Sequence, residues 1–263
     1  MVDFFGAKYH GRFNCFVDWS VFYYGAYEKE ALKLMRDILE LMDAPITLDV
    51  GANVGHHSLF ASMYSKEVIA FEPYPAVARE IQEKVDVNDI QNITLCPVGL
   101  GEKDATLPFK EPDACNTGTG SFLVSGDPIP VRSLTELRVV NGDAYLSAIR
   151  VPKVDFIKID IEGYEVYALH GLRQTLKKFR PVLLVEWSWL TRTTLKEESF
   201  TDLYPEDYVF YQHKPHTPVL HFFRKLDYDL IPLKENPSDG NILAMPIEFA
   251  ERFATHLPAL KRG

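Results

Sequence analysis

The sequence predicts an α/β fold with a mostly parallel sheet and helices on both faces. Apolar segments of strand length alternate with segments of helical periodicity. A glycine turn, GANVG at residues 51–55, follows the first strand and opens a helix, as in a parallel crossover. Four apolar segments also end in an acid, and these are Asp49, Glu72, Asp160 and Glu186. The carboxyl ends of parallel strands face one crevice, so we expect these four acids to converge.

The expected elements follow in chain order. Residues 27–42 carry apolar side chains at helical intervals and predict an amphipathic helix before the first strand. The first expected strand begins at residue 46 with ITLDV, and the second is EVIAFEP at 67–73. A helix is expected at 76–87 and a third strand at 92–98. VDFIKID at 154–160 and RPVLLVEW at 180–187 are further strands, the first followed by a turn at Gly163 into a helix. DYVFYQHK, YDLIPL and NILAMP are the last three expected strands.

Length and composition favour one domain. The 263 residues, 46% of them hydrophobic, suffice for one large core. We expect a single domain over 1–263, with an N-terminal helical segment at 1–44, a core at 45–246 that contains an insertion at about 104–133, and a C-terminal tail at 247–263. Within the insertion, NTGTGS at 116–121 is rich in groups that can order around a ligand, as a lid or as a plain hairpin loop.

Charge and cysteine content limit the classes of partner. A formal net charge of −9 argues against nucleic acid, which needs a basic surface to displace counterions. No segment approaches the ~20 apolar residues of a membrane helix. Three cysteines, an odd number without metal-type spacing, are expected to be reduced thiols, and we expect a soluble cytoplasmic protein.

The segment ITLDVGANVGHHS at 46–58 has the features of a nucleoside-cofactor site. Gly51 and Gly55 lack Cβ, so backbone can approach a ligand there, and the helix beginning near His56 offers N–H groups and a positive dipole end to a carboxylate. Glu72 follows Asp49 by 23 positions, where an acid takes ribose hydroxyls. Because GANVG lacks the third glycine of a dinucleotide fingerprint, S-adenosylmethionine is favoured over NAD. A simple βα turn is the competing interpretation.

Lys158 and Asp160 lie on one face of an otherwise apolar strand. Buried alone, each would cost several kcal/mol, roughly, so they should pair with each other or with a ligand. A structural ion pair is the alternative. His56 and His57 are interpreted as residues that start a helix, because a helix N-terminus disfavours the imidazolium form.

A series of motifs over residues 25–246 resembles the FkbM family of S-adenosylmethionine-dependent methyltransferases. In chain order the motifs are LDVGANVG, AFEPYP, NITLCPVGLGEK, FIKIDIEGYE, RPVLLVEW and NILAMP. The resemblance implies a Rossmann-like class I methyltransferase fold with a seven-stranded, mostly parallel sheet. It also implies O-methylation of a sugar, glycan precursor or natural product. GAYEKEAL resembles the family's tyrosine–glutamate pair and would bring Glu28 near the cofactor. The expected cofactor-binding residues are Glu28, Asp49, Gly51, Asn53, Gly55, Glu72, Pro73 and Tyr74.

For catalysis, an alcohol is a feeble nucleophile, so a carboxylate should take its proton as the new bond forms. Asp160 is the first candidate, with Glu186 sharing the role, Lys158 keeping Asp160 ionised, and Glu162 binding the cofactor's amino group or an acceptor hydroxyl. A divalent metal on these carboxylates is allowed but not expected. Two other classes stay open. An N-methyltransferase would carry an Asn/Asp-Pro-Pro-aromatic motif where this chain has IDIEGY, and a non-catalytic scaffold would be expected to lose the cofactor acids.

Overall fold

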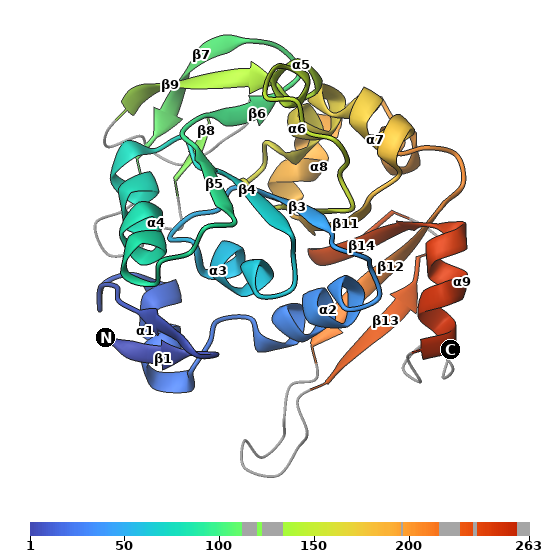
Figure 1. Ribbon diagram of the computed structural model, residues 1–263. Coiled ribbons are helices and arrows are strands. Elements are labelled where there is room, and N and C mark those ends of the chain that lie inside the picture. The colour runs from blue at the N-terminus through green and yellow to red at the C-terminus, as the bar shows by residue number, and fades with distance from the viewer. Residues whose placement is uncertain (112–119, 123–133, 196, 216–226, 234–235, 257–263) are drawn as a thin grey trace.

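The computed structural model describes residues 1–111, 120–122, 134–195, 197–215, 227–233 and 236–256. Its central sheet has the strand order β13-β12-β14-β11-β10-β3-β4-β5 (Figure 1). The parallel strands are β3 (Ile46–Val50), β4 (Glu67–Phe71), β5 (Ile93–Cys96), β10 (Phe156–Ile159) and β11 (Val182–Trp187). The antiparallel part comprises β14 (Gly240–Pro246), β12 (Tyr208–Pro215) and β13 (Tyr228–Pro232). The expected α/β class is confirmed.

The number of strands differs from the expected seven. Within the described residues the sheet has eight, because β13 pairs with the outer edge of β12 from Tyr211↔Pro232 to Pro215↔Tyr228. The other seven strands form the mostly parallel sheet that the sequence predicted, and β14 lies antiparallel between β11 and β12. The eighth strand is therefore an addition at the edge farthest from β5, and it leaves the order of the inner strands unchanged.

Helices cover both faces of this sheet (Figure 1). Side chains alternate along each strand, so Leu48 and Ile157 face one hydrophobic core while Phe156 faces the other. The first core is shared with α5 (Gly142–Ala148), α6 (Glu165–Gly171) and α7 (Arg173–Phe179). The second is shared with α2 (Lys29–Leu39), α3 (His56–Ser62) and α9 (Ile247–His256). Beside them, α4 (Pro75–Val87) packs Ile81 and Val85 on Ala70 of β4, and α8 (Trp189–Leu195) and a 3-10 turn (Phe200–Leu203) lie near α6.

The expected insertion begins in a second, smaller sheet (Figure 1). Its strands, in the order β6-β9-β7-β8, are β6 (Gly99–Gly101), β9 (Leu134–Asn141), β7 (Ala105–Lys110) and β8 (Ser121–Phe122). Phe122 of β8 packs against Phe109, with ring centroids 5.2 Å apart. Gly120 and Ser121 belong to the described residues, but the rest of the NTGTGS segment lies outside them.

Both ends of the chain differ from expectation. The N-terminal segment is not only helical, because β1 (Val2–Phe4) and β2 (Ala7–Tyr9) form a hairpin before α1 (Phe16–Tyr24). Gly6, with φ +93°, supplies the turn of that hairpin. The segment expected as a C-terminal tail begins with α9, whose Phe249 and Phe253 are buried against the sheet.

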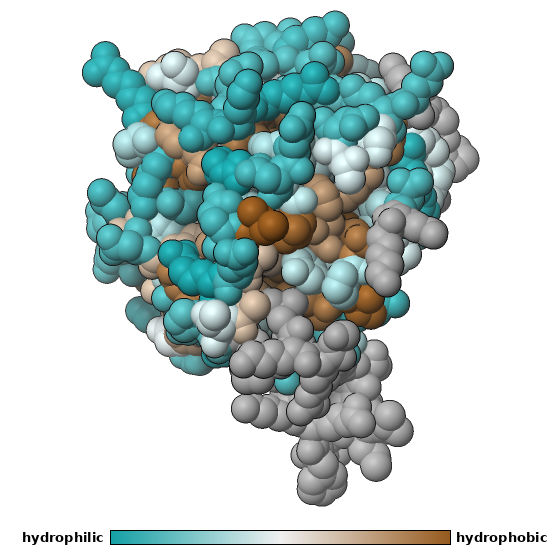
Figure 2. All heavy atoms as spheres, turned by 90° about the vertical axis from the view of Figure 1, so that its right-hand side faces the viewer, coloured by the Kyte–Doolittle hydropathy of each residue, from teal (hydrophilic) through white to brown (hydrophobic). Residues whose placement is uncertain are grey.

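Figure 2 shows the side of the molecule that carries α9 and the edge strand β13. Most of this face is hydrophilic, with a small hydrophobic area beside the grey atoms. Among the described helices, none is both long enough and apolar enough to cross a membrane.

Candidate cofactor and catalytic site

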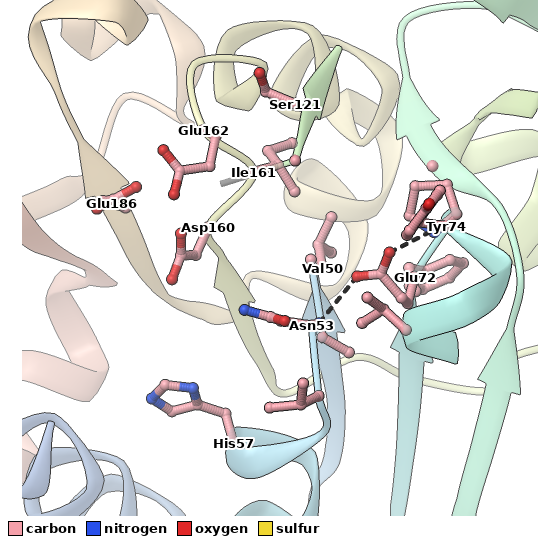
Figure 3. Close-up of a pocket in the computed structure, with 18 of the residues that line it drawn as sticks. Val50, Asn53, His57, Glu72, Tyr74, Ser121, Asp160, Ile161, Glu162 and Glu186 are labelled. Atoms are coloured by element: carbon pink, nitrogen blue, oxygen red, sulfur yellow. Dashed lines mark hydrogen bonds between the residues drawn. The ribbon is translucent and has the colours of Figure 1, made fainter. Parts of the chain in front are cut away.

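A pocket lies at the carboxyl ends of β3, β4, β10 and β11, where the sequence predicted a crevice (Figure 3). Its walls also include residues of α1, α3, β7 and β8. Its empty volume, which includes open solvent at the mouth, is about 1200 Å³. The pocket is therefore open to solvent and not an enclosed cavity.

The turn after β3 depends on glycine at position 51. The backbone N–H groups of Gly51 and Ala52 both donate to the carbonyl oxygen of Phe71, each at 3.0 Å. Gly51 has φ +81°, and a Cβ there would collide with the backbone carbonyl oxygen of Asp160 and with Ile161. The turn thus places backbone close to the end of β10, whereas the predicted approach of this backbone to a ligand stays a prediction. Gly55, with φ +82°, precedes α3.

Glu72 follows β4 and forms one wall of the pocket. Its carboxylate accepts hydrogen bonds from the backbone N–H of Asn53 at 3.0 Å and of Tyr74 at 2.9 Å, drawn as dashed lines in Figure 3. Burial raises the pKa of Glu72 to about 7, against the effect of these two donors. Pro73 and Tyr74 line the same wall, and the ring of Tyr74 stacks with Phe109 at 5.7 Å. The expected ribose and adenine residues therefore lie together.

Asp49 does not reach the pocket. β3 continues to Val50, so Asp49 lies one residue before the strand end and faces inward, 1% exposed, below the lining residues. Its Oδ2 accepts from Ser58 Oγ at 2.5 Å, and it pairs in register with Lys158. Burial raises its pKa although Lys158 opposes the shift. Asp49 thus contacts Ser58 of α3 and lies beside Lys158 beneath the pocket, and its contact with the cofactor stays a prediction.

Lys158, Asp160 and Glu186 form a charged group at the ends of β10 and β11. The Nζ atom of Lys158 lies 2.9 Å from Asp160 Oδ2, and Lys158 is 3% exposed. Burial disfavours the ammonium of Lys158, but Asp160, Asp49 and Glu28 together raise its pKa. The pKa of Asp160 is lowered despite burial, because Lys158 and a hydrogen bond from Glu186 stabilise the carboxylate. Asp160 and burial raise the pKa of Glu186 to about 10, so Glu186 is protonated at neutral pH and Asp160 is ionised.

Glu162 completes a group of three carboxyls on this side of the pocket (Figure 3). Its backbone has φ +54°, an uncommon conformation for a residue with a side chain. Burial, then Asp160 and Glu165, raise its pKa to about 7. Asp160, Glu162 and Glu186 each have one carboxylate oxygen that lies within 4.8 Å of those of the other two. Hard cations bind such oxygen sets, but one oxygen of Asp160 is already paired with Lys158.

Four further residues line the pocket, and these are Tyr27, Glu28, His56 and His57. They come from the segment before α2 and from the start of α3. Glu28 lies in the pocket wall in a left-handed conformation, φ +45°, just before α2, and burial followed by Asp160 raises its pKa to about 7. His57 Nε2 lies 3.6 Å from Glu28 Oε2, and burial together with Lys158 lowers the pKa of His57, so its ring is neutral. Tyr27 donates its backbone N–H to His56 Nε2 at 3.2 Å. Both histidines are therefore pocket residues as well as the start of α3.

The pocket has an excess of acidic groups. Of the described residues that line it, five carry carboxyl groups and one, Lys158, carries an ammonium. Their mutual repulsion is consistent with the raised pKa values of Glu28, Glu162 and Glu186. Such a wall favours a cationic ligand and disfavours a pyrophosphate, which carries negative charge. Electrostatics and the glycine spacing thus both point away from a dinucleotide.

The family model that matches this chain is the methyltransferase FkbM domain, over residues 49–230. The chain belongs to the FkbM methyltransferase family. The matched range includes both walls of the pocket, from the end of β3 through Glu186. The family predicted from the sequence motifs is thereby confirmed.

Curated relatives of this FkbM domain protein include two methyltransferases. The hexuronic acid methyltransferase AglP of Haloferax volcanii is 27% identical over 159 residues, which is 60% of this chain and 61% of that protein. The 2-O-methyltransferase NoeI of Sinorhizobium fredii is 24% identical over 165 residues, 57% of this chain and 67% of that protein. The matches thus span about three fifths to two thirds of the relatives' length.

Among solved structures, the methyltransferase FkbM from Methylobacillus flagellatus is similar to this chain with a TM-score of 0.44 and 21% identity. The similarity covers 76% of this chain and 43% of that one.

The aromatic and histidine-rich stretch from Trp187 contributes several side chains to the core, although Trp189 is exposed. Trp187, Tyr204 and Tyr208 belong to the hydrophobic core, and His213 is 5% exposed beside Tyr228. His216 and residues 221–223 lie outside the described residues. Among the described residues, Cys15 and Cys96 are buried and form no disulfide, and Cys115 lies outside the described residues.

Proposed function

We propose that this protein transfers the methyl group of S-adenosylmethionine to a hydroxyl oxygen of a sugar or a glycan precursor. The observation that carries the proposal is the division of the pocket into two acidic walls. Glu72 lies on one side, at the place of a ribose acid, and the ionised Asp160 lies on the other with Glu162 and Glu186 (Figure 3). A nucleoside that binds at Glu72 can present its sulfonium toward Asp160.

The residues in the pocket fit this cofactor. Among the described residues, Asn53 Oδ1 is buried in the pocket wall without a hydrogen-bond partner, so it can bind a donor of the cofactor. Glu72 would accept from the ribose hydroxyls, Tyr74 and Pro73 would border the adenine, and Glu28 would face the methionine ammonium. The five carboxyl groups favour a positively charged ligand. When bound, the cofactor supplies an electrophilic methyl group, and the protein must provide alignment and a proton acceptor.

Asp160 has the properties of the proton acceptor. It is ionised, it lines the pocket, and Lys158 holds one of its oxygens in place at 2.9 Å. A carboxylate with a lowered pKa is a weak base before reaction, but the oxygen of an alcohol becomes strongly acidic as it acquires a methyl group. Asp160 can therefore take the proton while the C–O bond forms, and protonated Glu186 stabilises its charge before that step.

Sugar is the proposed acceptor class because of the chemistry named for the relatives. One acts on hexuronic acid and the other at a 2-O position, by their names. The proposal includes a cytoplasmic location. It includes no requirement for a divalent metal, because the ammonium of Lys158 already balances the carboxylate of Asp160. N-methylation of a peptide has less support, since IDIEGY replaces the expected motif. A scaffold without turnover has less support because Glu72, Asp160 and Glu186 all line the pocket.

Calorimetric titration with S-adenosylmethionine, S-adenosylhomocysteine and NAD tests the cofactor, with E72A as the site variant. We expect micromolar binding of the two sulfur compounds by the wild type, loss in E72A, and no binding of NAD. Radiolabelled methyl transfer to a panel of sugars then tests the reaction, with and without EDTA. Binding of NAD alone would contradict the methyltransferase, and turnover abolished by EDTA and restored by Mg²⁺ would contradict the metal-free mechanism.

A further inference from the structure

The outer face of α1 exposes a row of aromatic side chains that the proposed chemistry does not use. Phe16, Tyr23 and Tyr24 are 53%, 63% and 60% exposed, and Trp19 is half-buried among them. These four residues form the aromatic face. Single exposed apolar residues are ordinary, but a contiguous group of large rings marks an interaction surface.

Buried polar contacts fix this orientation of α1. Asp18, on the inner side of the helix, is 0% exposed and accepts hydrogen bonds from Tyr9 Oη and from the backbone N–H of Arg12, both at 2.8 Å. The Nζ atom of Lys84 in α4 lies 4.0 Å from Asp18 Oδ1. Rotation of α1 to bury its rings would draw Asp18 out of this network. The aromatic residues therefore face solvent because the other side of the helix is anchored.

The aromatic face continues directly from the pocket wall. Tyr27 and Phe16 both line the pocket, and their ring centroids are 5.7 Å apart. Phe16 stacks on Trp19 at 6.3 Å and 15°, and Trp19 contacts Tyr23 at 4.9 Å. A series of touching rings thus leads from the pocket to the exposed end of α1.

The chemistry of this face selects among partners. The only charged residue of α1 is Asp18, which is buried, so the rings have no neighbouring cation on their own helix. Interfacial membrane helices and nucleic-acid surfaces rely on lysine and arginine. Flat rings with tyrosine hydroxyls at their edges instead match a ligand that combines flat apolar C–H faces with hydroxyl groups. Pyranose rings have this structure.

We propose that the aromatic face binds the sugar units that adjoin the methylated unit of an oligosaccharide acceptor. This inference rests on the proposed sugar methyltransferase function and extends it from a single sugar to a chain. The methylated unit would lie at the three carboxyls, the next unit at Phe16, and further units at Trp19 and Tyr23. Chain length then contributes to affinity while the reacting groups stay the same.

Binding of sugars of increasing length tests the proposal. The probes are glucose, maltose and maltotetraose, and galacturonic acid with its di- and tetramer. Calorimetric titration gives the dissociation constant for every variant, and methyl transfer gives kcat/KM for any probe that reacts. For at least one series we expect the tetramer to bind about tenfold more tightly than the monomer, as two stacked rings allow. W19A and Y23A should remove that dependence and leave monomer binding unchanged.

A matched control is W189A, which removes a tryptophan that is 47% exposed on α8 and outside the pocket lining. W19F should keep part of the length dependence, which separates stacking from misfolding. The proposal is overturned if W19A and Y23A bind tetramers as the wild type does, if no probe gains affinity with length, or if light scattering shows a dimer that W19A dissociates. Normal binding of S-adenosylhomocysteine without methylation of any sugar would defeat the proposed function, whereas length dependence lost in W19A would still support the aromatic face.

Discussion

At the scale of single residues, the pairing of Asp160 with Lys158 makes a definite prediction about catalysis. Replacing Asp160 by asparagine should lower kcat by at least about 100-fold, because the proton of the acceptor hydroxyl loses its base. Affinity for S-adenosylmethionine should change only a few-fold. Single-turnover methyl transfer gives the rate, and calorimetry gives the affinity.

E162Q is the control for D160N, since Glu162 lies in the same group of carboxyls but is the more exposed residue. Circular dichroism must accompany D160N, because this change leaves Lys158 buried without its 2.9 Å partner. A folded D160N variant with nearly normal kcat, beside an inactive E162Q, would assign the base to Glu162, whose pKa near 7 also suits that role.

Glu72 should make the apoprotein less stable as pH rises. Burial raises its pKa from 4.5 to about 7, so between these values the folded chain binds a proton that the unfolded chain has released. The free energy of unfolding therefore falls between pH 4.5 and 7, by roughly 3 kcal/mol for a fully expressed shift of this size. The pKa values of Glu28 and Glu162 are also raised, so these residues likewise lower the free energy of unfolding as pH rises.

Urea unfolding of wild type and E72Q at pH 5, 6, 7 and 8 measures this effect. E72Q loses a hydrogen-bond acceptor and should be less stable than the wild type at pH 5, with a gap that narrows toward pH 8. Parallel stability curves would show that Glu72 already ionises near its ordinary pKa in the folded chain.

Sequence reasoning at this scale succeeded where a side chain follows the end of a strand. Glu72 and Asp160 lie just beyond the carboxyl ends of β4 and β10, Glu186 lies one residue before the end of β11, and all three line the pocket. Asp49 also lies one residue before the end of its strand, but its side chain is 1% exposed and lies below the pocket lining. Phe16 was missed because its approach to the pocket depends on how α1 docks, which local sequence does not encode.

At the scale of elements, the turn after β3 predicts a strong requirement for glycine. G51A should destabilise the protein by about 2 kcal/mol or more, because a left-handed alanine costs about 1–2 kcal/mol and its Cβ also meets Asp160 O and Ile161. G6A is the matched control, since Gly6 has φ +93° and nothing within 4 Å of the added Cβ. Denaturant unfolding compares the two variants, and equal losses would show that the collision at position 51 is relieved.

The anchor of α1 makes a second prediction for an element. D18A should cost about 3–5 kcal/mol, because it leaves Lys84, which is 0% exposed, without its nearest carboxylate. The double variant D18L/K84M should recover much of that loss by removing both charges. Thermal or urea unfolding measures each change. A D18A variant within 1 kcal/mol of wild type would mean that Glu80 alone can balance Lys84.

Elements were predicted best where periodicity is strong. The amphipathic pattern of residues 27–42 gave α2, and the acid-terminated apolar runs gave the parallel strands. The β1–β2 hairpin was missed because each of its strands has only three residues, too few for a pattern. For residues 247–263 the sequence predicted only a C-terminal tail, whereas the structure has α9 there. Its Phe249, Ala250 and Phe253 are buried and recur at helical spacing.

At the scale of the whole molecule, fold class and family followed from the order of motifs along the chain, while the pairing of the second sheet did not. YDLIPL was predicted as a strand, but its place as an eighth strand beside β12 was not. Strand pairing between β6 and β9 joins residues about 40 positions apart, and no local propensity specifies it. The proposed acceptor surface combines residues of α1, β8 and the ends of β10 and β11, which only the folded chain brings together.

Net charge predicts how acceptors of different charge respond to salt. The chain carries a formal net charge of −9, so a uronic acid is repelled during approach while a neutral sugar is not. Raising NaCl from about 20 to about 200 mM shortens the screening length from roughly 20 Å to below 10 Å. KM for a uronic acid acceptor should therefore fall about two- to fivefold, with KM for a neutral sugar unchanged. Initial rates of methyl transfer measure both constants. A KM for the uronic acid that rises with salt would reveal a basic acceptor subsite strong enough to outweigh the acidic pocket.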